Sequence, residues 1–255
     1  MKYVKGRGFL PEEGDTTGLF DEDRPCDLTP PVHAPAVTYY FSAAGSDKND
    51  GLSPECPKRT LAEAARLVRR GGVCAAFRGG DVFEGGLCIE TQRPLPVLVC
   101  GYGKGMPVFR GGEAVIRVHS SHVTLRGLEV TDPQALRGIF VCPHRAGALT
   151  DVAVEDCYVH DVNFFWDSSV PPAQTDPDEV DVERVCPEYY PGTRTYWRYN
   201  RRSHGGIIFL NETEKETGAS WFENIYILRN RVENVARTGI YLANVWADSP
   251  GVGYG

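Results

Sequence analysis

The side chains best suited to acid–base chemistry gather around one long stretch of the sequence, residues 162–204. Two carboxylates at a suitable separation can donate a proton to a leaving group and activate water, so pairing Asp161 with Glu212 predicts hydrolysis of a glycosidic bond. For any one of these residues a purely structural role is the competing interpretation, because Asp161 could simply satisfy a bend. The expected catalytic set is Asp161, Glu212, His204, His160 and Asp248.

The stretch itself mixes aromatic residues with arginines, as in Tyr196-Trp-Arg198 and Arg201-Arg202. Aromatic faces give flat apolar surfaces for sugar rings, and guanidinium groups donate paired hydrogen bonds to hydroxyls or carboxylates. The alternative is that the aromatics only pack the loop against the rest of the fold. The residues expected to bind substrate are Trp166, Tyr196, Trp197, Arg201, Arg202, Arg237 and Trp246.

Two further chemistries fit the same residues. Arg201 and Arg202 could neutralise a uronate while the neighbouring His204 removes its acidified proton, which is the route of a polysaccharide lyase acting by β-elimination. A third interpretation is a carbohydrate-binding or adhesin-type surface without catalysis. Lyase products carry an unsaturated bond that absorbs ultraviolet light, and hydrolase products do not.

Two acidic stretches raise the question of a metal ion. Residues 176–183 hold five carboxylates, and Asp47, Asn49 and Asp50 resemble the start of a calcium-binding loop. Hard cations prefer such oxygen ligands. However, no Glu follows at the twelfth position of the second stretch, and the first fits a solvated acidic face. We therefore expect no metal ligands and no cofactor, with Ca²⁺ as the alternative.

A ten-residue repeat specifies the elements that must position these groups. The segments starting at Val123, Val152 and Ile225 align without gaps, with aliphatic residues at positions one, three and eight and Asp or Asn at position ten. A second strand opening with Gly138, Gly206 or Gly239 follows each segment. Such short paired strands bury their apolar faces only by stacking on neighbouring units, which predicts a solenoid of parallel strands.

The middle repeat is interrupted. Gly138 follows the tenth position by six residues and Gly239 by five, whereas Gly206 follows it by 45, so about 39 residues are inserted there. Long loops in compact repeats are usually functional or disordered. The loop 162–204 is therefore an insertion at a bend of the solenoid.

The start of the chain predicts a cap. Residues 1–36 are rich in proline and read as an irregular lead-in, and residues 37–255 form the solenoid. Leu61, Ala64 and Val68 recur at helical spacing, so a helix is expected over residues 61–70. Thr60 and Glu63 are spaced as a capping box at its first turn.

The run Tyr39-Tyr-Phe-Ser-Ala-Ala-Gly-Ser-Asp-Lys-Asn-Asp-Gly51, then Ser53-Pro, the helix and Phe77-Arg-Gly-Gly-Asp-Val-Phe83, carries a family resemblance. It resembles the N-terminal part of bacterial right-handed parallel β-helix proteins of the pectate-lyase-like superfamily, which holds polysaccharide lyases and glycoside hydrolases. The resemblance implies an all-β right-handed parallel β-helix whose N-terminal end is capped by the helix. It implies a polysaccharide or oligosaccharide as the partner.

The remaining features limit which partners and which cellular location we expect. Residues 245–255 follow a strand without a capping element, so we expect an uncapped, truncated solenoid whose end is covered by further C-terminal turns or a partner chain. A net charge of −7 argues against nucleic acid, and no apolar stretch is long enough for a membrane span. No signal peptide is visible, and five cysteines in apolar runs are expected as reduced core residues, which favours a cytoplasmic location. These are Cys74, Cys88, Cys100, Cys142 and Cys157.

Overall fold

A computed structural model describes residues 2–4, 8–10, 35–163, 204–211, 220–235 and 238–244. The chain divides into two compact units, Met1–Pro30 and Pro31–Gly255. In the first unit, β1 (Lys2–Val4) pairs with β2 (Gly8–Leu10) as an antiparallel hairpin. The expectation of an irregular lead-in therefore missed two short strands, which contain the strand-favouring residues Tyr3, Val4 and Phe9.

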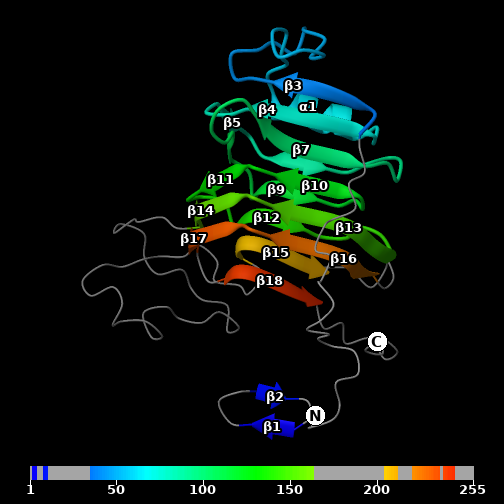
Figure 1. The fold of residues 1–255 in the computed structure, drawn as a ribbon, viewed down its shortest axis with the longest axis vertical. Helices are drawn as coiled ribbons and strands as arrows, with labels where there is room; N and C mark the ends of the chain where they lie inside the picture. Colours follow the sequence, from blue (N-terminus) through cyan, green and yellow to red (C-terminus); the bar gives the residue numbers. More distant parts are fainter. Residues whose placement is uncertain are drawn as a thin grey trace, which may run out of the picture. The chain divides into compact units, whose positions relative to one another are not determined.

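The second unit is a right-handed parallel β-helix built from three parallel sheets (Figure 1). Its first sheet contains β3 (Val37–Phe41), β4 (Val73–Arg78), β7 (Val97–Tyr102), β10 (Val123–Arg126), β13 (Gly147–Glu155) and β16 (Ser220–Leu228). The second contains β5 (Val82–Glu84), β8 (Val108–Arg110), β11 (Glu129–Asp132), β14 (Tyr158–Val162) and β17 (Arg231–Val235). The third contains β6 (Leu87–Ile89), β9 (Ala114–Val118), β12 (Arg137–Val141), β15 (Gly205–Asn211) and β18 (Thr238–Asn244).

The strand register confirms the repeat. Val123 pairs with Val152, and Val152 pairs with Ile225, so the first positions of the three segments lie side by side. Val123 and Val152 are fully buried in the solenoid interior. Each coil thus contributes its aliphatic positions to one continuous core, as expected of a repeat that cannot bury its apolar face alone.

The glycines that open the third-sheet strands stand where a side chain has no room. A Cβ atom on Gly138 would lie 2.7 Å from Val159 Cγ1, and one on Gly206 would lie 2.5 Å from the Gly239 carbonyl oxygen. At Gly239, in the last described coil, the nearest atom would be 3.8 Å away. Glycine is therefore required by close contact at the two positions on which a further coil stacks.

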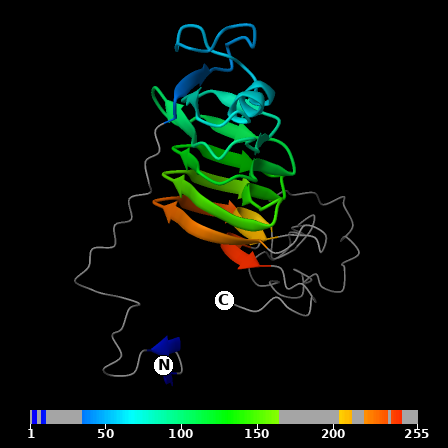
Figure 2. The same cartoon turned by 90° about the vertical axis from the view of Figure 1, so that its right-hand side faces the viewer.

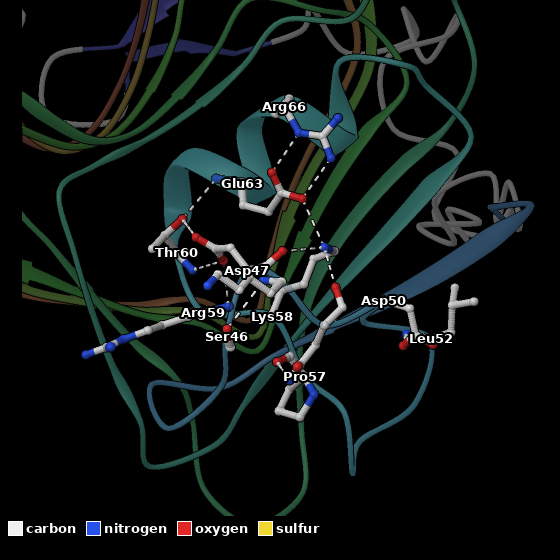
Figure 3. Close-up of polar contacts among 12 residues, drawn as sticks. Ser46, Asp47, Asp50, Leu52, Pro57, Lys58, Arg59, Thr60, Glu63 and Arg66 are labelled. Carbon is white, nitrogen blue, oxygen red and sulfur yellow. Dashed lines mark hydrogen bonds and ion pairs between the residues drawn. The ribbon is translucent and has the colours of Figure 1, made fainter.

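The capping helix α1 spans Leu61–Val68, two residues shorter than expected (Figure 2). It begins as predicted, because Thr60 Oγ1 accepts a hydrogen bond from Glu63 N at 3.1 Å. The second half of the expected capping box is wrong. Asp47 Oδ1 accepts from Thr60 N at 3.0 Å, while the Glu63 carboxylate binds Arg66 and Lys58 instead (Figure 3).

The core runs the length of the stack from the buried face of α1 to the last coil. The helix residues Leu61, Leu67 and Val68 face the core and are almost fully buried. At the other end Ile240 and Leu242, whose strand neighbours Ile207 and Phe209 are buried, remain 49% and 59% exposed. The described solenoid therefore has one covered end and one apolar open end.

The six described cysteines are free, but not all lie in the core as expected. Cys74, Cys142 and Cys157 are buried, whereas Cys88 is exposed and Cys100 half-buried. Cys88 lies between the buried Leu87 and Ile89, and alternate residues of a strand face opposite sides, so its side chain points outward. No helix in the described ranges is long and apolar enough to cross a membrane.

Candidate functional site on the second sheet

The structure locates three of the predicted site residues. His160 and Asp161 lie at the end of β14, and His204 lies buried just before β15. β14 ends and β15 begins at the bend where the insertion interrupts the repeat. The other predicted residues lie outside the described ranges: Glu212, Asp248, Trp166, Tyr196, Trp197, Arg201, Arg202, Arg237 and Trp246.

Glu212 lies outside the described residues, so the pairing of Asp161 with Glu212 stays a prediction. Among the described residues, the Asp161 carboxylate contacts His160 of its own strand.

Asp161 sits on a bulge that turns it away from the core. Its φ of 50° is left-handed, and the pairing of β14 with β11 shifts there, so Asp132 pairs with Val162. Asp side chains tolerate this conformation better than most. Asp161 Oδ2 lies 2.8 Å from His160 Nδ1, and the carboxylate remains 43% exposed.

His160 bridges two carboxylates. Its Nδ1 contacts Asp161, and its Nε2 lies 3.2 Å from Glu129 Oε1 on the preceding coil. These contacts place the two carboxylates no more than about 8 Å apart, given the width of an imidazole ring. This upper limit is compatible with the range of about 5–10 Å used by glycosidase carboxylate pairs, and here the imidazole occupies the space between the two groups.

A tyrosine and an arginine extend the cluster onto the next coil. The Tyr158 ring stacks on the His160 ring with centroids 4.2 Å apart. The Arg231 guanidinium lies over the Tyr158 ring, 4.9 Å from its centroid. The Tyr158 hydroxyl donates to Glu233, whose other oxygen accepts from Arg231 at 2.7 Å. Tyr158 and then Arg231 stabilise the carboxylate, so the pKa of Glu233 lies below its usual range.

The sequence signal for this cluster lay in the repeat itself. Glu129, Tyr158 and Arg231 occupy its seventh position, and His160 and Glu233 occupy the ninth. Both positions flank the invariantly aliphatic eighth, so they face outward and stack from coil to coil. The aliphatic positions of the repeat predict only the core. Glu129, Tyr158, Arg231 and Glu233 lie at outward positions and were therefore not predicted as site residues.

The structure describes one of the two acidic stretches that raised the question of a metal ion. No three His, Cys, Asp or Glu side chains in these ranges are grouped to hold an ion. At the turn of Asp47 and Asn49, the Lys58 ammonium donates to both of their carbonyl oxygens, at 3.2 and 2.7 Å (Figure 3). A cationic group of the protein thus occupies the place a calcium ion would take. The acidic stretch 176–183 lies outside the described ranges.

Comparison with known proteins supports the fold. No protein-family model matches the sequence, and no curated protein matches it. Two crystal structures of a GH136 lacto-N-biosidase from Eubacterium ramulus, selenomethionine and native, match with TM-scores of 0.56 and 0.54 at 19% and 18% identity. An alginate lyase from Paenibacillus sp. str. FPU-7 matches with a TM-score of 0.35 at 11% identity over 66% of this chain and 56% of that chain.

The match covers only part of the larger protein. Each lacto-N-biosidase alignment takes in 80% of this chain and 35% of the other chain. The present chain therefore spans about a third of the protein whose fold it shares. At this identity the likeness establishes a parallel β-helix and nothing about the reaction.

Proposed function

We propose that this chain is part of a carbohydrate-active enzyme that hydrolyses glycosidic bonds of a polysaccharide or oligosaccharide. The observation that carries the proposal is the outer face of the second sheet, where Glu129, His160 and Asp161 form one hydrogen-bonded row. Carboxylates held at this spacing are the groups that hydrolysis needs. The chain shares its fold with a lacto-N-biosidase, so a parallel β-helix is a fold on which glycoside hydrolysis can be built.

The environments suggest different roles for the carboxylates. Glu233 keeps its charge because Tyr158 and Arg231 bind it, which suits a group that stabilises positive charge rather than a proton donor. Asp161, exposed and in contact with His160, is positioned to exchange protons with substrate or water. Glu212 and Asp248 remain candidate partners from outside the described ranges, and the insertion that follows β14 would contribute Trp166, Tyr196, Trp197, Arg201 and Arg202 to binding.

A lyase is the second candidate, favoured by Arg231. Its guanidinium is 69% exposed above the Tyr158 ring, which itself stacks on His160. The cation could neutralise a uronate while the histidine or the tyrosine, as the base, accepts the acidified proton. Under either candidate we expect the last described coil to be covered. Its exposed Ile240 and Leu242 offer an apolar surface for additional coils or a partner chain.

The test is a product assay of the whole chain on a panel of neutral and acidic polysaccharides. We expect new reducing ends without ultraviolet absorbance. Asp161→Asn and Glu129→Gln should each lower the rate by about 100-fold or more, the usual contribution of an acid–base group. The matched control is Glu84→Gln, an exposed glutamate of the same sheet paired only with Arg110 among described residues, which should leave the rate unchanged.

Each result decides between the candidates. Ultraviolet-absorbing products would replace hydrolysis by elimination. Full hydrolysis by both Asp161→Asn and Glu129→Gln would refute the assignment to this face. Binding of a sugar without any product would identify a non-catalytic binding module.

A further inference from the structure

A groove of about 260 Å³ lies at a different bend of the solenoid, where third-sheet strands lead into the first sheet. Three turns that line the groove differ in length. Residues 90–96 follow β6, residues 119–122 follow β9, and residues 142–146 follow β12. The short middle turn lies between two longer ones, so it forms the floor of the groove and they form its walls.

The floor presents a histidine in a defined state. His119 Nδ1 lies 2.7 Å from the Cys142 carbonyl oxygen, which can only accept, so Nδ1 carries the proton. Burial is the main reason that the pKa of His119 falls to about 4. At neutral pH the ring is therefore uncharged, and Nε2 keeps a lone pair with no hydrogen-bond partner among the described residues.

The walls contribute charge and a flat surface. The exposed His144 ring stacks on His119 with centroids 3.2 Å apart. Arg145 reaches Glu90 only at 4.0 Å and is 82% exposed, and Arg93 is exposed without an ion pair among the described residues. The lining thus carries two guanidinium groups and one carboxylate, a local positive excess on a chain of net charge −7.

The floor is fixed by hydrogen bonds between coils. Ser120 Oγ accepts from Thr91 N at 2.7 Å, and Ser121 Oγ accepts from Thr150 N at 2.9 Å. These bonds tie the middle turn to both neighbouring coils. The groove is therefore preformed rather than assembled on binding, which reduces the entropic cost of holding a ligand.

We propose that this groove binds one sugar unit that carries an anionic group, at a site separate from the row of Glu129, His160 and Asp161. Drug-sized ligands occupy pockets of about 300–1,000 Å³, so this volume suits a single ring. The paired imidazoles face the ring, Nε2 of His119 accepts from a hydroxyl, and Arg93 and Arg145 bind the anion. The inference extends the proposed function but does not require cleavage.

The proposal is tested by measuring how sugars bind to the whole chain. Each sugar is titrated into the protein, and the NMR signals of the histidine side chains report where it binds. The probes are glucuronate, glucose 6-sulfate and glucose. We expect both anionic sugars to bind and to shift the signals of His119 and His144, and glucose to bind at least tenfold more weakly. The shared requirement is the anion, and the two anionic probes show whether a carboxylate or a sulfate fits better.

Arg93→Gln with Arg145→Gln should weaken the binding of the anionic sugars by tenfold or more. Arg110→Gln, which removes an exposed arginine from the second sheet, is the matched control and should leave binding unchanged. Equal binding by the double variant, equal binding of glucose, unshifted histidine signals or no binding at all would each overturn the proposal. Loss of hydrolysis in Asp161→Asn with binding retained would separate the two sites.

Discussion

The two bends that flank the third sheet differ in how closely successive coils are stacked. Where third-sheet strands begin, Gly138 and Gly206 leave no room for a Cβ atom between coils. Where the same strands end, the turns 90–96, 119–122 and 142–146 change length from coil to coil and leave a groove. One bend is closed by contact between stacked coils, and the other is open.

The difference shows where a solenoid can vary its chemistry. At the closed bend the inner positions are fixed by contact between coils. Turn length varies there too, from residues 85–86 after β5 to the insertion after β14, and so do outward side chains such as His160 and Tyr158. At the open bend a change of one to three residues in turn length is enough to create a concave site, because no stacked glycine constrains it.

The largest expected effect tests the closed bend. Gly206→Ala places a methyl group 2.5 Å from the Gly239 carbonyl oxygen and 2.7 Å from Val232 Cγ1. Relieving such contacts shifts the backbone of stacked coils, so we expect a loss of about 1–3 kcal/mol or more in the free energy of unfolding. Denaturant-induced unfolding followed by circular dichroism measures it.

Gly239→Ala is the matched control from the same position of the repeat. Its added methyl group would have its nearest neighbour at 3.8 Å, an ordinary contact, so the free energy of unfolding should change much less. Equal losses for the two variants would show that glycine is needed there for another reason than the stacking of coils.

The repeat explains why the closed bend was predictable. Aliphatic positions one, three and eight follow from the need to fill one core, and the register of Val123, Val152 and Ile225 bears them out. The start of the helix at Thr60 was equally predictable from the sequence, because the Thr60 hydroxyl accepts a hydrogen bond from Glu63 N. Its partner Asp47 was not, because a contact between residues 13 positions apart depends on how a loop folds.

The candidate sites were less predictable for the same physical reason. Asp161 and His160 were found because they border the insertion. Glu129 and Glu233 come from neighbouring coils, and only the register brings them to His160 and Tyr158. The groove has no repeat signal at all, because it arises from the unequal lengths of three turns.

The next effect concerns the open bend and its pH dependence. The pKa of His119 is about 4 in the folded chain, below the usual value of 6.5, so folding favours the neutral ring. This stabilisation is fully present above about pH 6.5 and is lost as the pH falls towards 4. Midpoints of denaturant unfolding measured across that window should decline on acidification.

His119→Asn should remove the part of this decline that belongs to the buried ring, because its amide does not titrate. His144→Asn, which changes the exposed ring of the same pair, should retain it. Identical pH profiles for the parent chain and His119→Asn would contradict the assignment.

A smaller effect is expected from the floor of the groove. Ser120 is 8% exposed, and its hydroxyl is the acceptor for Thr91 N. Ser120→Ala leaves that N–H unpaired, at a cost of about 1 kcal/mol in the free energy of unfolding. Ser120→Thr keeps the hydroxyl and should recover most of the loss. Failure of that rescue would mean that packing, not the hydrogen bond, holds the turn.

The smallest effect separates residues that hold the fold from residues left free to bind. Arg145→Ala removes a mostly exposed side chain whose only described ion pair spans 4.0 Å, so unfolding should change by less than about 0.5 kcal/mol. Arg126→Ala should cost more, because Arg126 reaches the buried Glu155 carboxylate at 2.6 Å. If Arg145→Ala proves equally costly, that arginine has a structural role, and its part in binding an anion loses support. If its cost is negligible while anionic sugars bind more weakly, the wall of the groove is specialised for a ligand.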